Sequence, residues 1–485
     1  MRSVGVINFS RRSGNSNRKM PEYASERKRN ESGWIFCLVG EDSGSFWKGW
    51  KNVKVLVTGA NGFIGKNLIA ELVNRGKKQG KQVVVHKEIP KKNQGKKPER
   101  ESENQTEDLF VIQYFTHDMP VEALKELVKD CGFVFHFAGV NRPKEEKEFE
   151  EGNTELTRRL LSFLESEKIL APVLISSSTQ AELDNAYGKS KKMAEDEVLS
   201  YSRRNQVPVF VYRLPNVFGK WSRPNYNTVA ATFCHNIAHG LPIQVNHEEH
   251  KLTLAYIDDV VEAFLGKSAA FLWGENESGK KEKEGMYLSG KEADFVEGVR
   301  CPQAEGNAPY LSIPVTHEVT LGRLAKVISS FPEMRKNLEV PDMGDALTRK
   351  LYSMYLSYLP EEDFSYPLRM HEDARGSFTE FLRTRERGQV SVNISRPGIT
   401  KGNHWHHSKN EKFLVVKGTG VIRFRKAGEE KVIEYPVSGE KLEVVDIPTG
   451  YTHSITNTGD EDMVTVMWAN ESFDPERPDT FYEEV

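Results

Sequence analysis

A tyrosine and a lysine in the first half of the chain have the spacing of a proton-transfer pair. Tyr187 and Lys191 lie four residues apart, so on a helix their side chains share one face. A neighbouring ammonium lowers the pKa of a phenol, which lets tyrosine exchange a proton with a carbonyl or alcohol oxygen while a hydride moves. The run Ser176–Ser178 lies just upstream and offers a hydroxyl to the same oxygen, and the residues alone do not decide which serine acts. Taken alone, the pair could equally be an ordinary surface pair on a helix.

Glycines spaced Gly-x-x-Gly-x-x-Gly follow a short apolar run and are suited to holding a dinucleotide. Glycine permits a tight turn and lets backbone N–H groups approach a pyrophosphate at the N-terminus of the next helix, where the helix dipole favours negative charge. A tight strand-to-helix turn without a ligand is the alternative for this segment alone. The predicted cofactor-binding residues of the turn are Gly59, Asn61, Gly62, Phe63, Ile64 and Gly65.

The residues after the second predicted strand bear on which nicotinamide cofactor is used. This strand covers residues 82–85, and His86 and Lys87 follow it, with further lysines beyond. An Asp or Glu that would accept a hydrogen bond from the ribose 2′-hydroxyl of NADH is missing from this place. The sequence therefore favours NADPH over NADH.

Three histidines and a glutamate in the second half of the chain have the spacing of a metal site. His404 and His406 would lie on one face of a strand, because side chains alternate along it. Glu411 would begin the next strand, and His453 follows a Pro-x-Gly turn. Imidazole and carboxylate donors suit one divalent cation, with zinc as the first candidate and manganese, iron or nickel as others. The alternative is a group of hydrogen-bonded polar side chains without a metal.

The pattern of apolar runs predicts two unlike domains to position these groups. Strand-like and helix-like runs alternate between residues 53 and 212, which is typical of an α/β fold with a doubly wound parallel sheet. Past about residue 375 the runs are short, β-rich and separated by turn residues, as in an antiparallel jelly-roll barrel. We therefore predict an α/β domain over residues 51–355 and an all-β domain over residues 356–485.

Composition excludes several classes of protein. The 485 residues suffice for two or three domains, and the net charge of 67 − 70 = −3 argues against a protein that mainly binds nucleic acid or an anionic membrane. No apolar run approaches the roughly 20 residues needed to span a bilayer. Four widely spaced cysteines favour a reducing compartment, and hence a cytoplasmic protein. Residues 1–50 are predicted to be a disordered basic extension, and residues 87–108 and 274–309 to be surface inserts.

Further runs resemble the extended short-chain dehydrogenase/reductase family, a Rossmann-fold family most of whose members act on nucleotide sugars. His136 to Gly139 follows the fourth predicted strand, Arg213 to Gly219 follows the sixth, and Tyr256 to Val260 resembles the hinge into the smaller substrate subdomain. The resemblance implies that Ser178, Tyr187 and Lys191 form the catalytic triad. It also adds Ala138 and Gly139 to the cofactor site and places Arg213 and Asn216 near the substrate.

The second half is similar to the cupin family. One cupin motif is matched from Gly398 to Gly418 and the other from Pro448 to Asn457. Eight residues rather than five separate Gly439 from Pro448, a difference that a longer hairpin absorbs. The resemblance supports His404, His406, Glu411 and His453 as ligands, whereas His407 faces the other way on its strand.

The combination of the two domains resembles a family of enzymes of capsular polysaccharide and O-antigen synthesis. That resemblance implies that the cupin epimerises C3 of a UDP-2-acetamido-2,6-dideoxy-hexos-4-ulose. The reductase would then reduce the C4 ketone with NADPH, giving UDP-2-acetamido-2,6-dideoxy-L-talose on the route to UDP-N-acetyl-L-fucosamine. A homodimer is expected, Tyr451 beside His453 is a candidate proton donor, and the sequence does not identify the base.

Other functions fit the same residues. An epimerase or dehydratase would recycle bound NAD, and its cupin would only bind sugar or form a dimer. A cupin dioxygenase fused to a reductase would consume oxygen. The sequence also leaves open whether the metal is catalytic or structural.

Overall fold

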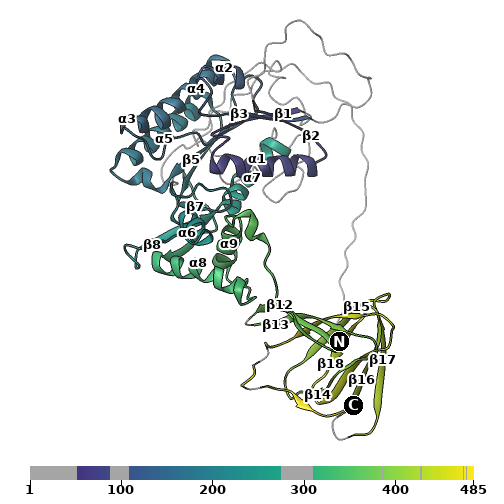
Figure 1. Ribbon diagram of the computed structural model, residues 1–485. Coiled ribbons are helices and arrows are strands. Elements are labelled where there is room, and N and C mark those ends of the chain that lie inside the picture. The colour runs from purple at the N-terminus through teal and green to yellow at the C-terminus, as the bar shows by residue number, and fades with distance from the viewer. Residues whose placement is uncertain are drawn as a thin grey trace, which may run out of the picture. The chain divides into compact units, whose positions relative to one another are not determined.

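The structure is a computed structural model that describes residues 52–87, 109–274, 310–384, 386–426, 429–472, 474–476 and 478–485 (Figure 1). The predicted basic extension and nearly all of both predicted inserts lie outside these residues. No helix in the described ranges is both long and apolar enough to cross a bilayer. The predicted domain boundary between residues 355 and 356 stays a prediction.

A seven-stranded parallel sheet forms the centre of the first domain and confirms the predicted α/β fold. Its strands lie in the order β2-β3-β1-β4-β5-β6-β9. Runs such as 133–136 are buried along their whole length, because helices cover both faces of a sheet of this kind. The strands are β1 (Asn52–Thr58), β2 (Gln82–His86), β3 (Leu109–Phe115), β4 (Phe133–His136), β5 (Val173–Ser178), β6 (Val209–Leu214) and β9 (Tyr310–Leu311).

Helices lie on both faces of this sheet (Figure 1), and a hydrophobic core flanks it on each face. Apolar residues of α1 (Phe63–Lys78) and α7 (Ile257–Trp273) pack in the first core. The second core contains residues of α2 (Ala123–Leu127), α4 (Leu156–Ser166) and α5 (Ala186–Asn205), the helix that carries Tyr187 and Lys191. Packing on both faces therefore fixes the carboxyl ends of the strands, where α/β proteins place their ligands.

The strand order of this sheet bears on the choice of cofactor. β3, rather than β2, lies beside β1, with Thr58 opposite Phe115, and β2 is at the edge of the sheet. The backbone N–H of Gly59 donates a hydrogen bond of 2.9 Å to the carbonyl oxygen of Phe115. The residues that follow the strand next to the glycine turn are thus 116–118, whereas Lys87 follows the edge strand β2. The long stretch between β2 and β3 lets the chain put β2 outside β3.

A smaller unit follows the last long strand of the sheet. Its strands pair in the order β10-β8-β7, and its helices share one core with them. Tyr256 ends β8 and Ile257 begins α7, so the segment expected to be a hinge is a strand-to-helix junction. The elements are β7 (Asn216–Phe218), β8 (Lys251–Tyr256), β10 (His317–Thr320), α6 (Val229–Ala238), α8 (Leu321–Lys336) and α9 (Ala346–Leu356).

The chain beyond residue 370 forms two antiparallel sheets, as the predicted jelly roll requires. Their orders are β11-β12-β13-β20-β15-β18 and β17-β16-β19-β14-β21. Phe413, Ile422 and Ile455 are among the residues that fill the core between them. The strands are β11 (His371–Asp373), β12 (Gly376–Thr384), β13 (Gly388–Ser395), β14 (Thr400–Trp405), β15 (Glu411–Lys417), β16 (Thr419–Lys426), β17 (Val432–Ser438), β18 (Val444–Ile447), β19 (Tyr451–Asn457), β20 (Met463–Ala469) and β21 (Phe481–Tyr482).

One predicted strand of the barrel begins later than expected. The short β-rich runs expected past residue 375 include 441–445, but β18 starts at Val444. Ser438 and Lys441 form an isolated antiparallel bridge, and pairing with β15 begins only at Val444.

Candidate active site and metal centre

The glycine turn packs directly on the end of β4. Gly59 has φ +67°, and a Cβ atom there would lie 2.7 Å from the backbone nitrogen of Ala138. A Cβ atom on Gly65 would lie 2.3 Å from the carbonyl oxygen of Gly59. Only glycine fits these close backbone approaches, so the turn, Ala138 and Gly139 come together as a continuous surface that can cradle a dinucleotide.

Tyr187 sits in the first turn of α5, and a residue that the sequence analysis missed holds its hydroxyl. The Asn185 side chain caps the helix by accepting a hydrogen bond of 2.7 Å from the backbone N–H of Gly188. The Tyr187 hydroxyl donates to Asn141 Oδ1 at 3.0 Å. Asn141 lies in the loop after β4, in the same run as Ala138. Its position as a polar residue after the carboxyl end of a strand is the sequence signal that could have identified it.

Lys191 is buried against the loop that follows β4. A Cβ atom on Gly139 would lie 3.1 Å from Lys191 Nζ and 2.5 Å from Asn153 Oδ1. Asn153 accepts from the backbone N–H of Val140 and donates to the Ser190 hydroxyl, which ties this loop to α5. Asn153 was also missed, because it belongs to a short π-helix (η1, Glu150–Glu155) that no sequence pattern announced.

Burial shifts the pKa values of both members of the pair. It lowers the pKa of Lys191 to about 8, against an opposing effect of Glu195. Burial raises the pKa of Tyr187, although its interaction with Ser178 lowers it. The lowered phenol pKa expected from the sequence is therefore wrong for this structure. Lys191 Nζ lies 5.8 Å from the centroid of the Tyr187 ring, and desolvation of the phenol outweighs that distant charge.

The three serines at the end of β5 have different surroundings. Ser178 interacts with Tyr187, and its predicted catalytic role stays a prediction. Ser177 is buried and donates a hydrogen bond of 2.6 Å to Glu195 Oε1. Ser176 is buried as well.

Arg213 and Asn216, the predicted substrate-binding residues, differ in their surroundings. The guanidinium of Arg213 contacts Glu195 at 2.7 Å and Glu182 at 2.7 Å, and it lies 3.4 Å from the centroid of the Tyr310 ring. Its charge is thus already matched by two carboxylates. Asn216 is exposed at the start of β7. Contact of either residue with a substrate stays a prediction.

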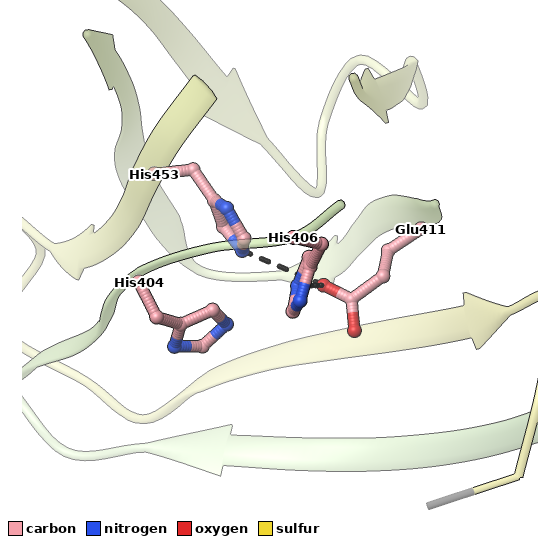
Figure 2. Close-up of side chains that lie close together, drawn as sticks. All are labelled: His404, His406, Glu411 and His453. Atoms are coloured by element: carbon pink, nitrogen blue, oxygen red, sulfur yellow. Dashed lines mark ion pairs between the residues drawn. The ribbon is translucent and has the colours of Figure 1, made fainter. Parts of the chain in front are cut away.

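The four predicted metal ligands come together inside the barrel (Figure 2). One ligand atom from each of His404, His406, Glu411 and His453 lies within 4.8 Å of the others. His404 pairs with His453 across β14 and β19, and their ring centroids are 4.6 Å apart. His406 follows β14, and Glu411 begins β15 as expected.

Buried donor atoms in this group fit a cation. His406 Nε2, Glu411 Oε2 and both ring nitrogens of His453 are buried without a hydrogen-bond partner. Glu411 Oε2 lies 3.6 Å from His406 Nε2 and 3.4 Å from His453 Nε2. Burying such atoms unpaired is costly, and a divalent cation would satisfy one ligand atom of each of these three residues at once.

The charges of the ligands also suit a cation. Burial, together with the neighbouring His453 and His406, lowers the pKa of His404 to about 4, so this ring is neutral near pH 7. Burial raises the pKa of Glu411, but contacts with His406, His453 and Lys409 hold it well below its usual range. His404 therefore offers a neutral imidazole and Glu411 a carboxylate, the forms that bind metals.

Tyr451, the predicted proton donor, begins β19 but lines a different space. It borders a cavity of about 520 Å³ with Phe424, Tyr435 and Val445, among others. The four ligands are not among the described residues that line this cavity. Its role as a proton donor stays a prediction.

Comparisons with known proteins agree with this division of the chain. Residues 55–268 match the NAD dependent epimerase/dehydratase family, and residues 371–481 match the polysaccharide biosynthesis C-terminal domain. A protein of Pseudomonas aeruginosa named UDP-2-acetamido-2,6-beta-L-arabino-hexul-4-ose reductase is 42% identical over 429 residues, which are 88% of this chain and 98% of that protein.

Solved structures extend the likeness to both domains. The capsular polysaccharide assembling protein CapF of Staphylococcus aureus is 44% identical, with a TM-score of 0.70 over 89% of this chain and 100% of that one. CapF with the inhibitor 3-isopropenyl-tropolone gives 39% identity and a TM-score of 0.66, over 89% and 100% of the two chains. The chain is thus an extended short-chain dehydrogenase/reductase joined to a cupin. It belongs to the family that contains this reductase and CapF.

Replacing Gly65 by alanine tests the cofactor turn. The added methyl would meet the Gly59 carbonyl oxygen and the Ala60 backbone, so the turn must shift, at roughly 1–3 kcal/mol. Nicotinamide cofactor binding, followed by fluorescence titration, should weaken at least about tenfold, the equivalent of about 1.4 kcal/mol. Gly266→Ala in α7, where nothing lies within 4 Å of the new methyl, is the matched control and should bind normally. Normal binding by Gly65→Ala would contradict the assignment of the turn.

Replacing His404 and His406 together by alanine tests the metal centre. Elemental analysis of the wild-type protein should find one divalent ion per chain, and the double variant should lose it. Because metal binding contributes to folding, we also expect the barrel of the variant to melt at a lower temperature. His371→Ala, an exposed histidine of β11, serves as the control and should keep the ion. Full metal content in the double variant, or none in the wild type, would refute the site.

Proposed function

We propose that this chain is a bifunctional UDP-sugar enzyme of capsular polysaccharide synthesis. The barrel epimerises C3 of a UDP-2-acetamido-2,6-dideoxy-hexos-4-ulose, and the α/β domain reduces the C4 ketone to give UDP-2-acetamido-2,6-dideoxy-L-talose, a step toward UDP-N-acetyl-L-fucosamine. The observation that carries the proposal is the match to a UDP-hexul-4-ose reductase over 98% of that protein's length, since the match takes in both domains.

In the reduction, Tyr187 of α5 and Ser178 at the carboxyl end of β5 handle the ketone oxygen. A bound nicotinamide would supply the hydride to C4. Tyr187 gives its phenolic proton to the oxygen as the alcohol forms, and Ser178 donates a hydrogen bond to the same oxygen. Asn141 holds the Tyr187 hydroxyl at 3.0 Å, so the proton donor is oriented before substrate arrives. The ammonium of Lys191 stabilises the phenolate that remains.

NADPH is the hydride donor in this proposal, on the resemblance to the family. The lysines after β2 no longer support it, because residues 116–118 follow the strand beside the glycine turn. Of these, His117 and Asp118 are exposed, with Asp118 a carboxylate that would disfavour a 2′-phosphate. The ratio of kcat/KM for NADPH and NADH decides between the two cofactors.

In the epimerisation, the C4 ketone itself makes the C3 proton acidic. A base removes this proton to give an enolate, and an acid returns a proton to the opposite face. Tyr451 is the proposed acid, and the base is not assigned. A divalent cation held by the four ligands would either stabilise the enolate charge or fix the strands that shape the site. We favour the second role, because proton transfer next to a ketone does not need a metal.

The proposal also covers the oligomeric state of the protein and its location in the cell. We propose a homodimer, on the resemblance to the family. A cytoplasmic location fits a chain whose cysteines show no disulfide pattern, and Cys131 and Cys234 are free and buried.

Replacing Tyr187 by phenylalanine separates the two activities. Loss of the proton donor should slow oxidation of the reduced cofactor by roughly 10²-fold or more, the usual scale of general acid catalysis. Exchange of the C3 proton with D2O should continue, because it takes place in the barrel. Reduction at a near-normal rate in this variant would contradict the proposed role of Tyr187. Absence of C3 exchange in the wild type would instead favour a cupin that only binds sugar or forms a dimer.

The pH dependence of reduction should follow the charge of Lys191. Below its pKa of about 8 the ammonium is present, so kcat/KM should fall as the pH rises through about 8. Glu195 raises the pKa of Lys191, and Glu195→Gln should therefore move this loss of activity to lower pH. Glu182→Gln removes the exposed partner of Arg213 instead and should leave the profile in place. Identical profiles for wild type and Glu195→Gln would contradict the assignment.

A further inference from the structure

The last eight residues of the chain, 478–485, include a strand that pairs with β14, which carries His404 and ends just before His406. We call this segment the C-terminal strap. Its strand β21 pairs antiparallel with β14, with Tyr482 opposite His404 and Phe481 opposite Trp405. The Phe481 ring lies 5.0 Å from Trp405 and 4.9 Å from His407, between ring centroids. Arg425 and Thr452 also bind Glu483, so β16 and β19 hold the strap as well.

The strap supports an irregular part of β14. Gly402 has φ +102° and Asn403 has φ +58°, and the register with β19 shifts between Gly402 and His404. This bulge sets the direction in which His404 leaves the strand. The strap gives the extra residue of the bulge a hydrogen-bond partner, because the backbone N–H of Glu483 donates to the Asn403 carbonyl oxygen at 3.0 Å.

Asp479 of the strap reaches the ligands by two routes. Its main-chain carbonyl oxygen accepts a hydrogen bond from His406 Nδ1, which leaves Nε2 of that ring to face the other ligands. Its carboxylate accepts bonds from the backbone N–H groups of residues 407, 408 and 409, at 2.8, 2.7 and 2.9 Å. The turn closed in this way carries Lys409, whose Nζ lies 2.9 Å from Glu411 Oε1.

We infer that the strap is a positioning element of the metal centre, and that Asp479 is its principal residue. Asp479 contributes no ligand to the group of four, yet it orients His406 directly and Glu411 through the turn of residues 407–409. Removing such an outer partner of a metal ligand typically costs 10- to 100-fold in affinity. The affinity of the barrel for a divalent cation therefore depends on the C-terminal end of the chain. This inference rests on the proposed metal centre.

The test compares zinc affinity among full-length variants, measured by competition with a chromophoric chelator. Asp479→Asn keeps the main-chain oxygen and the shape of the residue but removes the charged acceptor of three N–H groups. We expect zinc to bind at least tenfold more weakly, and the visible spectrum of the Co²⁺-substituted protein to change because His406 and Glu411 are less well fixed. Glu484→Gln removes another strap carboxylate, which contacts Tyr482, and should bind zinc as the wild type does.

A purely structural strap would give a different pattern. In that case Asp479→Asn would melt earlier by the same amount with and without zinc, while zinc affinity and the Co²⁺ spectrum stayed unchanged, and the inference would be overturned. If Asp479→Asn does not fold, Ser408→Ala removes one hydrogen bond to the same carboxylate and should weaken zinc binding several-fold. Unchanged affinity in that variant would overturn the inference as well. A wild-type protein that binds no zinc or cobalt would refute the metal centre itself, a distinct result.

Discussion

Polar groups that are buried away from water need hydrogen-bond, ionic or metal partners. Both candidate sites of this chain are arranged around that constraint. In the barrel, buried atoms of His406, Glu411 and His453 have no hydrogen-bond partner, and the strands bring them close enough for the one cation that we propose. The bulge at Asn403, the turn before Glu411 and the hydrogen bond from His406 to Asp479 all serve this convergence. The jelly roll thus supplies fixed strand ends, and irregular backbone at those ends aims the ligands.

The α/β domain meets the same constraint with protein groups alone. Lys191 is buried beneath the loop after β4, and Glu195 one turn further along α5 offsets part of the desolvation. Glu195 is itself buried, and it is matched by Arg213 and by the Ser177 hydroxyl. This network joins α5 to β5 and β6, so the helix that carries the proposed proton donor is tied to the strand ends that are proposed to hold the ketone. Reduction needs this precision, because a hydride and a proton must reach adjacent atoms.

Elements and ligands were predictable where a local pattern encodes them. Apolar runs predicted the buried strands. The spacing of His404, His406, Glu411 and His453 predicted that these four side chains come together. The position of β2 was not predictable, because a strand ahead of a long insert can pair on either side of its neighbour. Asn153 depends on a π-helix and Asp479 acts partly through a main-chain oxygen, 73 residues from His406, which no residue type reveals. The raised pKa of Tyr187 follows from burial, which sequence spacing does not measure.

The most direct test of a two-site UDP-sugar enzyme is a product spectrum. The wild-type chain would be incubated in D2O with the UDP-4-keto sugar and reduced nicotinamide cofactor, and the product analysed by NMR. The account predicts a single alcohol of the L-talo configuration that carries deuterium at C3. An alcohol that keeps the starting configuration and the original proton at C3 would contradict it, and so would a ketone that is never reduced.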